Sequence, residues 1–204
     1  MYPACNDIGT AWTLVTGPTT EPISLTDVKL QSRIEDDNSN AILLSYITAA
    51  REACEAYMGR GLLTQTWKLL LDGFARRMPL PMAAPLASVT SVKYYDGTGT
   101  QQTLATSVYD TDPVSRPGTV VLKVGQTWPV VQSERRNGIV EIVYVVGWTE
   151  PELVPERIKQ GLRQYVTYLD LDRDGMEDRA LEALNAAYRC WSDRICWTSP
   201  EWTD

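Results

Sequence analysis

The longest segment with a helical pattern of hydrophobic residues runs from Asp37 to Gly61. Asn38 or Ser39 can cap its first turn with a side-chain oxygen, and Gly59 and Gly61 suit the left-handed backbone that ends a helix. Apolar residues in this segment recur at the spacing of one helix face. The inward stripe expected from this spacing is Ile42, Tyr46, Ala49, Ala53 and Tyr57, with Leu43, Ile47, Ala50 and Cys54 beside it.

The outer face of this helix is polar and carries Arg51 and Glu55, four residues apart. Residues at this spacing are neighbours on a helix, and an exposed pair of opposite charges stabilises it only slightly. The pattern therefore predicts a weak salt bridge on the protein surface.

The chain before this helix divides into an arm and a short helix. Residues 1–22 are rich in Thr, Pro and Gly and predict an irregular N-terminal arm. Ser24 and Asp27 fit a capping box, in which each side chain binds the backbone amide of the other residue. The short helix that follows is expected to turn Leu25 and Val28 inward, with Leu30 as a further candidate.

Residues 62–148 change to the alternating pattern that is typical of strands. Met78 to Pro85 contains three prolines, so this stretch should be extended and excluded from the middle of a sheet. Ile139 to Val146 is the most apolar strand and is expected to be central. About six strands are predicted, at Leu63–Leu71, Leu86–Tyr95, Gln101–Leu104, Val108–Thr111, Thr119–Val124 and Ile139–Val146.

Helical spacing returns at Pro155, a residue that suits the first position of a helix. Two helices are expected over residues 155–195, and Leu181, Tyr188 and Trp191 should face inward on the second. The predicted fold is α+β: a small bundle of about four helices with an antiparallel β-sheet or small barrel inserted between the second and third. The expected organisation is a single domain at 23–196, with helices at 24–61, the β insertion at 62–148 and helices at 155–195, followed by a C-terminal tail at 197–204.

The composition argues against most enzyme classes. The net charge is −7, and histidine is absent. Binding of nucleic acid without sequence preference depends on Lys and Arg, so this charge argues against it. The absence of histidine removes Ser-His-Asp and Cys-His catalysis and histidine-ligated metals. We therefore expect a protein that is not an enzyme, with no catalytic residue, cofactor or metal.

Cysteine use and hydropathy indicate the cellular compartment in which the protein is expected. The four cysteines form no Cys-x-x-Cys pair, which indicates a reducing cytoplasm. The N-terminus lacks the basic start and apolar core of a signal peptide. No apolar run approaches the ~20 residues that a membrane helix needs, so no membrane partner is expected.

Two short motifs suggest ligand binding. Asp170-x-Asp172-x-Asp174-Gly175 copies the first half of an EF-hand loop, but the twelfth position is Leu181 and not the required carboxylate. We interpret it as an acidic link between helices. Arg135 and Arg136 form a basic pair in a loop, which is either solvated or a binding element for protein or DNA.

Tryptophan occurs seven times. Trp128 lies in a predicted loop, and Trp197 and Trp202 lie in the tail, where no partner within the chain is evident. Such aromatic residues either fold back on their own domain or contact neighbouring subunits.

Phrases in a fixed order from about Glu21 to Arg189 resemble the head–tail connector proteins of long-tailed bacteriophages. The phrases are Ile23-Ser24-Leu25-Thr26-Asp27-Val28-Lys29, Ala49-Ala50-Arg51-Glu52, Glu55-Ala56-Tyr57-x-Gly59-Arg60, Leu63-Thr64-Gln65-Thr66-Trp67, Leu71-Asp72-Gly73-Phe74, Leu80-Pro81, Pro85-Leu86, Ser88-Val89, Val92-Lys93-Tyr94, Trp128-Pro129, Val143 to Gly147 and Val154-Pro155-x-x-Ile158-Lys159-Gln160. The N-terminal arm and the Trp-rich tail extend beyond the resemblance, and Gln31-Ser32-Arg33 is less apolar than the family's usual end of the first helix.

The resemblance implies a structural virion protein of the neck, assembled in the bacterial host cytoplasm. Such adaptors form a ring, typically dodecameric, on the portal protein, extend the DNA channel and offer a platform for the tail or a stopper protein. An acidic lumen would let DNA pass without binding it. The candidate interface residues are Arg51, Glu55 and Arg60 for contacts between subunits or within the helices, Trp128, Arg135 and Arg136 for the loop platform, Trp191 on the last helix, and Trp197 and Trp202 for the tail.

Three alternatives stay open from the sequence. The chain could be another neck or tail-completion subunit with a similar helical frame. It could be a non-viral protein-interaction module whose β insertion binds a peptide at its edge. A hydrolase that depends on carboxylates is the third.

Overall fold

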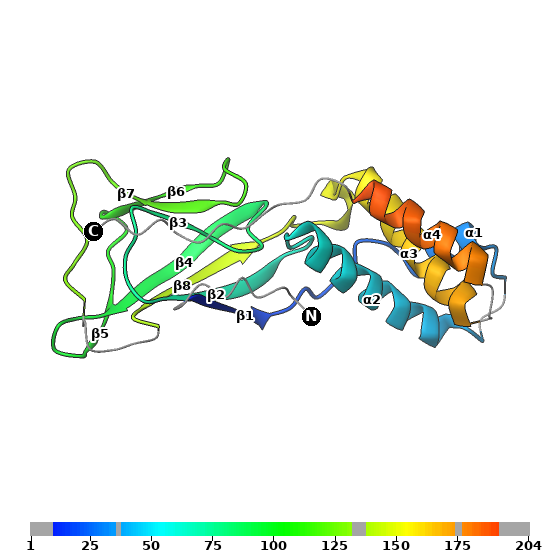
Figure 1. Cartoon of the computed structure of the whole chain (residues 1–204), viewed down its shortest axis with the longest axis horizontal. Coiled ribbons are helices and arrows are strands. Elements are labelled where there is room, and N and C mark those ends of the chain that lie inside the picture. Colours follow the sequence, from blue (N-terminus) through cyan, green and yellow to red (C-terminus); the bar gives the residue numbers. More distant parts are fainter. Residues whose placement is uncertain (1–9, 36–37, 132–137, 174–176, 192–204) are drawn as a thin grey trace. The chain divides into compact units, whose positions relative to one another are not determined.

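The computed structural model describes residues 10–35, 38–131, 138–173 and 177–191. Within these residues the chain forms four α-helices and antiparallel sheets, so it is a mixed α+β protein, as predicted (Figure 1). The chain divides into two compact units. The strand unit contains Met1–Gly17, Gly59–Gly147 and Ile195–Asp204, and the helical unit contains Pro18–Met58 and Trp148–Arg194.

The strand unit contains two antiparallel sheets, and Figure 1 shows the smaller one over one face of the larger. The larger sheet has the order β1-β2-β8-β4-β5, and the smaller has the order β3-β7-β6. The strands are β1 Thr10–Thr16, β2 Gln65–Leu71, β3 Arg77–Pro79, β4 Leu86–Tyr95, β5 Gln101–Thr103, β6 Tyr109–Asp112, β7 Thr119–Leu122 and β8 Val140–Val146.

Alternating side chains of β2 and β8 build the core of the strand unit. In both strands every second residue is buried, because successive side chains point to opposite faces of a sheet. The buried residues form one cluster with Val120 of β7 and Met78 of β3, so the two sheets share a single core. Tyr144 of β8 places its hydroxyl in this core and donates it to the carbonyl of Pro81 at 2.8 Å. Burial raises the pKa of Tyr144, which therefore stays neutral.

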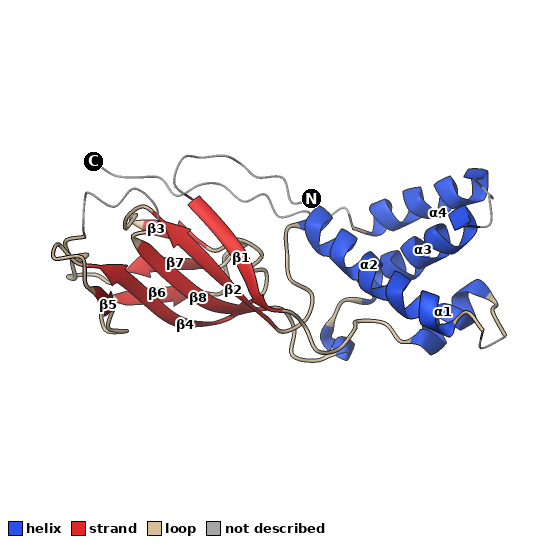
Figure 2. Ribbon diagram, turned by 90° about the horizontal axis from the view of Figure 1, so that it is seen from below, coloured by secondary structure: helices blue, strands red, loops and turns tan. Residues whose placement is uncertain are grey.

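The position of β8 in the middle of the larger sheet confirms the prediction from its apolar sequence. The proline-rich stretch contributes only β3, which lies at the edge of the smaller sheet, as expected for a segment whose prolines have no backbone N–H to donate. The prediction of an irregular arm was wrong for residues 10–16. These residues form β1, which pairs antiparallel with β2 along its length (Figure 2).

The helical unit is organised around α3, which packs against the other three helices. The elements are α1 Leu25–Ser32, α2 Asn40–Met58, the 3-10 turn η1 Pro151–Leu153, α3 Glu156–Arg173 and α4 Glu177–Cys190. The capping box at α1 is confirmed: the amide of Asp27 donates to the Ser24 hydroxyl at 3.1 Å, and the amide of Ser24 donates to the Asp27 carboxylate at 3.1 Å.

The buried face of α2 is rotated from the predicted stripe. Its centre is formed by the residues expected on the flank, including Leu43 and Ile47, while Ala49 is exposed. Three other inward predictions were wrong, because Leu30 of α1 is 80% exposed, and Leu181 and Tyr188 of α4 are 57% and 36% exposed. The ring of Tyr188 lies 4.8 Å from that of Tyr57 of α2, so this side chain is covered on one side only.

A glycine allows α3 and α4 to approach closely around Trp191. Trp191 is fully buried and donates its indole N–H to the carbonyl of Ile158 at 3.3 Å. A Cβ atom built on Gly161 of α3 would lie 2.2 Å from the indole nitrogen of Trp191. No larger residue fits at this position without displacing the indole.

We expect Gly161→Ala to destabilise the protein, although alanine normally favours a helix over glycine by about 0.5–1 kcal/mol. The added methyl group must push the indole from a close-packed site, and overpacking of this kind typically costs about 1–3 kcal/mol. Urea unfolding measures the change. Gly97→Ala is the matched control, because no atom lies within 4 Å of a Cβ at that position. Equal midpoints for the two variants would contradict this packing account.

Candidate functional site

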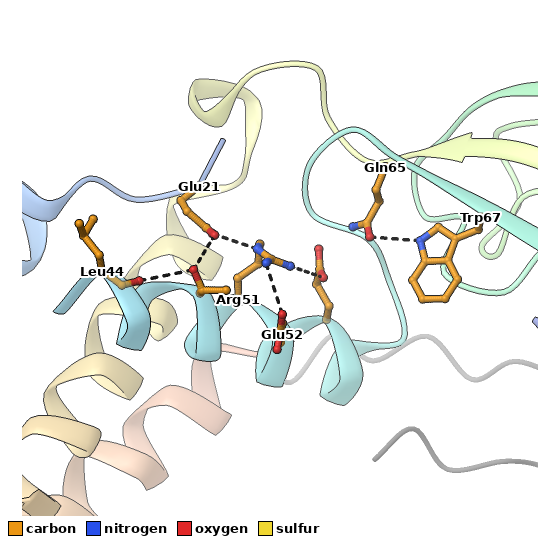
Figure 3. Close-up of polar contacts among 8 residues, drawn as sticks. Glu21, Leu44, Arg51, Glu52, Gln65 and Trp67 are labelled. Carbon is orange, nitrogen blue, oxygen red and sulfur yellow. Dashed lines mark hydrogen bonds and ion pairs between the residues drawn. The ribbon is translucent and has the colours of Figure 1, made fainter. Parts of the chain in front are cut away.

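A buried ion network joins α2 to the segment that precedes α1. The Nε atom of Arg51 lies 2.9 Å from a carboxylate oxygen of Glu21, and Nη1 lies 3.1 Å from Glu55. Figure 3 shows Glu21 pointing from that segment toward Arg51 on α2. Thr48, one turn before Arg51, donates its hydroxyl to the other oxygen of Glu21 at 3.0 Å. Glu21 is therefore held by two residues of α2.

The network lies inside the helical unit. Arg51 is only 7% exposed and Glu55 only 1%, so the prediction of a surface salt bridge was wrong. Burial opposes the charge on Arg51, but the carboxylates of Glu55 and Glu21 outweigh it and raise the pKa of Arg51 above its ordinary value. Its position favours the helix-fixing role over a contact between subunits. The sequence did not indicate Glu21, because it lies thirty residues from Arg51 in a stretch predicted to be irregular.

Three other candidates are partly or fully covered by their own chain. Arg60 is 5% exposed in the strand unit, where its backbone forms a bridge with Met82. Trp128 is half-buried and stacks on Phe74, with ring centroids 4.6 Å apart. Trp191 is fully buried, so its indole packs inside the helical unit and is not exposed to a partner.

The other sequence-predicted candidates, Arg135, Arg136, Trp197 and Trp202, lie outside the described residues. The acidic motif lies partly in the described chain, where Asp170 and Asp172 belong to α3 and not to the expected link. Among the residues that the structure describes, no three potential ligands gather as a metal site.

The net charge of the protein resides in one unit. The sequence of the helical unit contains 10 basic and 17 acidic residues, and that of the strand unit contains 9 of each. The helical unit therefore carries the whole net charge of −7, and the strand unit is neutral. Such an imbalance repels polyanions and favours cationic partners.

The helices that the structure describes are too short or too polar to cross a bilayer.

Comparisons with known proteins agree with the sequence resemblance. Residues 22–94 match the family model of the phage gp6-like head-tail connector protein, which confirms the resemblance over this segment. Among curated proteins, none matches the chain.

Several solved structures share the fold. A chain from the neck of an empty GTA particle, computed with C6 symmetry, is 21% identical with a TM-score of 0.71, and the match covers 92% of this chain and 97% of that one. A chain of the native gene transfer agent (GTA) virion is also 21% identical, with a TM-score of 0.67 and coverage of 92% and 96%. A chain from the native GTA neck, computed with C12 symmetry, is 19% identical, with a TM-score of 0.64 and coverage of 92% and 97%.

Substitution of Arg51 by methionine should strongly destabilise the helical unit. The variant keeps most of the side-chain volume but removes the guanidinium that pairs with the buried Glu55, and breaking a buried pair in this way costs about 3–5 kcal/mol. Chemical denaturation followed by circular dichroism measures the loss. The control is Glu52→Gln, which removes a charge 3.6 Å from the same arginine on an exposed side chain. Its effect should stay within about 0.5 kcal/mol. A similarly small effect for Arg51→Met would show that the network does not fix the helices.

Proposed function

We propose that this protein is a head–tail connector: a structural component of the virion neck that assembles as a ring and joins the head to the tail. The observation that carries the proposal is the combination of two matches. Residues 22–94 match the connector family, and a fold covering 92% of the chain recurs in necks computed with C6 and C12 symmetry. These symmetries support a homo-oligomeric ring, which we propose to be a dodecamer.

The proposed partners follow from this place in the particle. One side of the ring would contact the portal protein, and the other would present a platform for a tail-completion or stopper protein. We assign the platform to Trp128, Arg135 and Arg136 and the portal contact to the tail residues Trp197 and Trp202. The role is structural and not enzymatic, because the protein would act by burying surface against its neighbours.

The charge of the helical unit supports a role at the DNA channel. We propose that this unit faces the DNA, because its excess of seven acidic residues would repel phosphates and let DNA slide. The neutral strand unit has no such repulsion. It suits contacts with proteins, whose interfaces are depleted of charge at their centres.

We further propose that residues 23–196 form one connector domain that includes both units. In this arrangement β2 to β8 are an insertion between α2 and α3, which is consistent with the order of the elements. Because β1 precedes α1 in the sequence and pairs with β2, the N-terminal segment also contributes to the inserted sheet.

Particles assembled without this chain test the proposal. We expect heads that package DNA but then lose it or remain without tails, because the channel would lack its extension and its tail platform. Electron microscopy of the particles and a nuclease-protection assay measure these defects. Supplying the wild-type chain from a plasmid should restore tailed, infectious particles. Fully infectious particles in its absence would overturn the neck function.

A further inference from the structure

The larger sheet of the strand unit has two different edges. At one side β1 is the last strand, and Figure 2 shows it along the border of the sheet. At the other side β5 pairs only with residues 93–95 of β4. In the described chain, residues 87–91 of β4 lie beside β8 and have no strand on their other side. We call these residues the β4 edge.

Both edges lack the charges and prolines that usually keep an exposed edge from pairing. Unpaired backbone N–H and C=O groups on an edge strand can bind another strand, and charged side chains or proline commonly prevent this. Neither β1 nor the β4 edge contains a charged residue or a proline. Leu14 and Val15 of β1 are 46% and 54% exposed, and Ala87, Ser88 and Thr90 of β4 are exposed as well. The two edges therefore suit contact with a further strand.

The register of the sheet places the two edges at the same level along the strands. Leu14 of β1 pairs with Trp67 of β2. Trp67 pairs with Tyr144 of β8, and Tyr144 pairs with Val89 of β4. These four residues form one row across the sheet, which begins at the exposed Leu14 and ends in the β4 edge. The part of β4 that pairs with β5 lies level with Thr10, at the other end of β1.

The strand directions allow this sheet to continue into a second copy of the chain. β1, β2, β8 and β4 alternate in direction, because each neighbouring pair is antiparallel. β1 and β4 therefore run in opposite directions. A rotation about an axis along the strands keeps the direction and the level of every strand. It can place β1 of a second copy beside the β4 edge as an antiparallel partner, which is the arrangement found throughout this sheet.

A ring restricts which surfaces of two copies can meet. The inference rests on the proposed ring, and in a cyclic ring each copy binds the next through two different surfaces. Contact between two β1 strands would be isologous and would produce a dimer with two-fold symmetry. β1 and the β4 edge are different surfaces that match in direction and level. They also belong to the neutral strand unit, where copies do not repel one another as the acidic helical units do.

We propose that β1 of each copy pairs with the β4 edge of the next copy, with Leu14 beside Val89, so that the larger sheet continues around the ring. Both edges are irregular at this level: the register shifts between Leu14 and Thr16 of β1 and twice within residues 86–91 of β4. Such bulges oppose pairing with an arbitrary strand. The contact therefore involves few residues, and copies held side by side in a ring form it more readily than free copies.

Disulfide cross-linking in assembled particles tests this contact. Thr16 and Ser88 are exposed and lie at the two ends of the next row, which passes through Thr66 and Val145. Within one chain the two positions are three strand spacings apart, about 14 Å, which is too far for a disulfide. Residues directly opposite on paired strands have Cβ atoms about 5 Å apart, close to disulfide geometry. A bond between Thr16→Cys and Ser88→Cys therefore joins two copies.

The full-length chain with both substitutions is supplied to particles that lack the wild-type chain. After mild oxidation, their necks should show a ladder of covalent multimers on a non-reducing gel. Each single cysteine variant should stay at the level of the wild type, whose own cysteines set the background. The matched control combines Thr16→Cys with Gln101→Cys and should give no ladder. Gln101 is exposed but lies beside Tyr95 at the far end of β4, about 20 Å along the strand from Ser88.

Charge at the same two positions provides a second measurement. Thr16→Lys with Ser88→Lys places like charges opposite each other, whereas Thr16→Lys with Ser88→Glu places opposite charges there. The like-charged variant should form rings at least about fivefold less often, since like charges directly opposite on paired strands are unfavourable. Electron microscopy counts the rings in the necks. Both substituted side chains are exposed, so the purified variants should fold like the wild type by circular dichroism.

The outcomes separate the edge contact from the neck function. Intact rings with no ladder above the control, or equal numbers of rings for the two charge variants, would overturn the contact and leave the neck function standing. A cross-link to another virion protein would also overturn it, because a different strand would then occupy the edge. Wild-type necks that contain no ring of this chain would overturn the neck function itself.

Discussion

The buried guanidinium of Arg51 is the interaction on which the helical unit depends. It binds Glu55 of its own helix and Glu21 of the segment before α1, so one side chain fixes the position where the chain enters this unit. Inside a protein such a cation is stable only while its carboxylates stay in place. Trp191 has the corresponding role between α3 and α4, where packing and one hydrogen bond replace charge. The bundle is thus fixed by a polar contact on one side and an aromatic contact on the other.

Features that depend on nearby residues could be predicted from the sequence. The capping box needs only Ser24 and Asp27, and it is present. The apolar run of β8 correctly indicated a central strand: β8 lies between β2 and β4, and all of its residues are buried or half-buried. The family resemblance also relied on short phrases in order, and the match over residues 22–94 confirms it.

Features that depend on distant residues could not be predicted. Thr10–Thr16 forms a strand because β2, some fifty residues later, offers its edge, and nothing within the N-terminal segment indicates that edge. Arg51 and Glu55 have the spacing of an ordinary surface pair. Tertiary packing buries both side chains, and this burial could not be read from their spacing. The exposure of Leu30 has the same origin, since the register of α1 on its neighbours decides which residues they cover.

The division of charge and the division of structure follow the same boundaries. The acidic excess belongs to the helical unit, and the strand unit combines a neutral balance with a shared apolar core. The proposed connector role, in which the protein faces a DNA channel and also binds other proteins, would set two conflicting surface requirements. Two separate units would satisfy both, because each can have the surface that its own contacts require.

The path of the chain between the two units has a mechanical consequence. Within the residues that the structure describes, the backbone passes from one unit to the other after Gly17, after Met58 and after Gly147. A single cut by a protease at any of these points would therefore leave the units joined by covalent bonds. A pulling force between the units is likewise divided over several backbone links instead of acting on one hinge. Such load sharing would suit the proposed place in the neck, where a connector would have to withstand forces between the head and the tail.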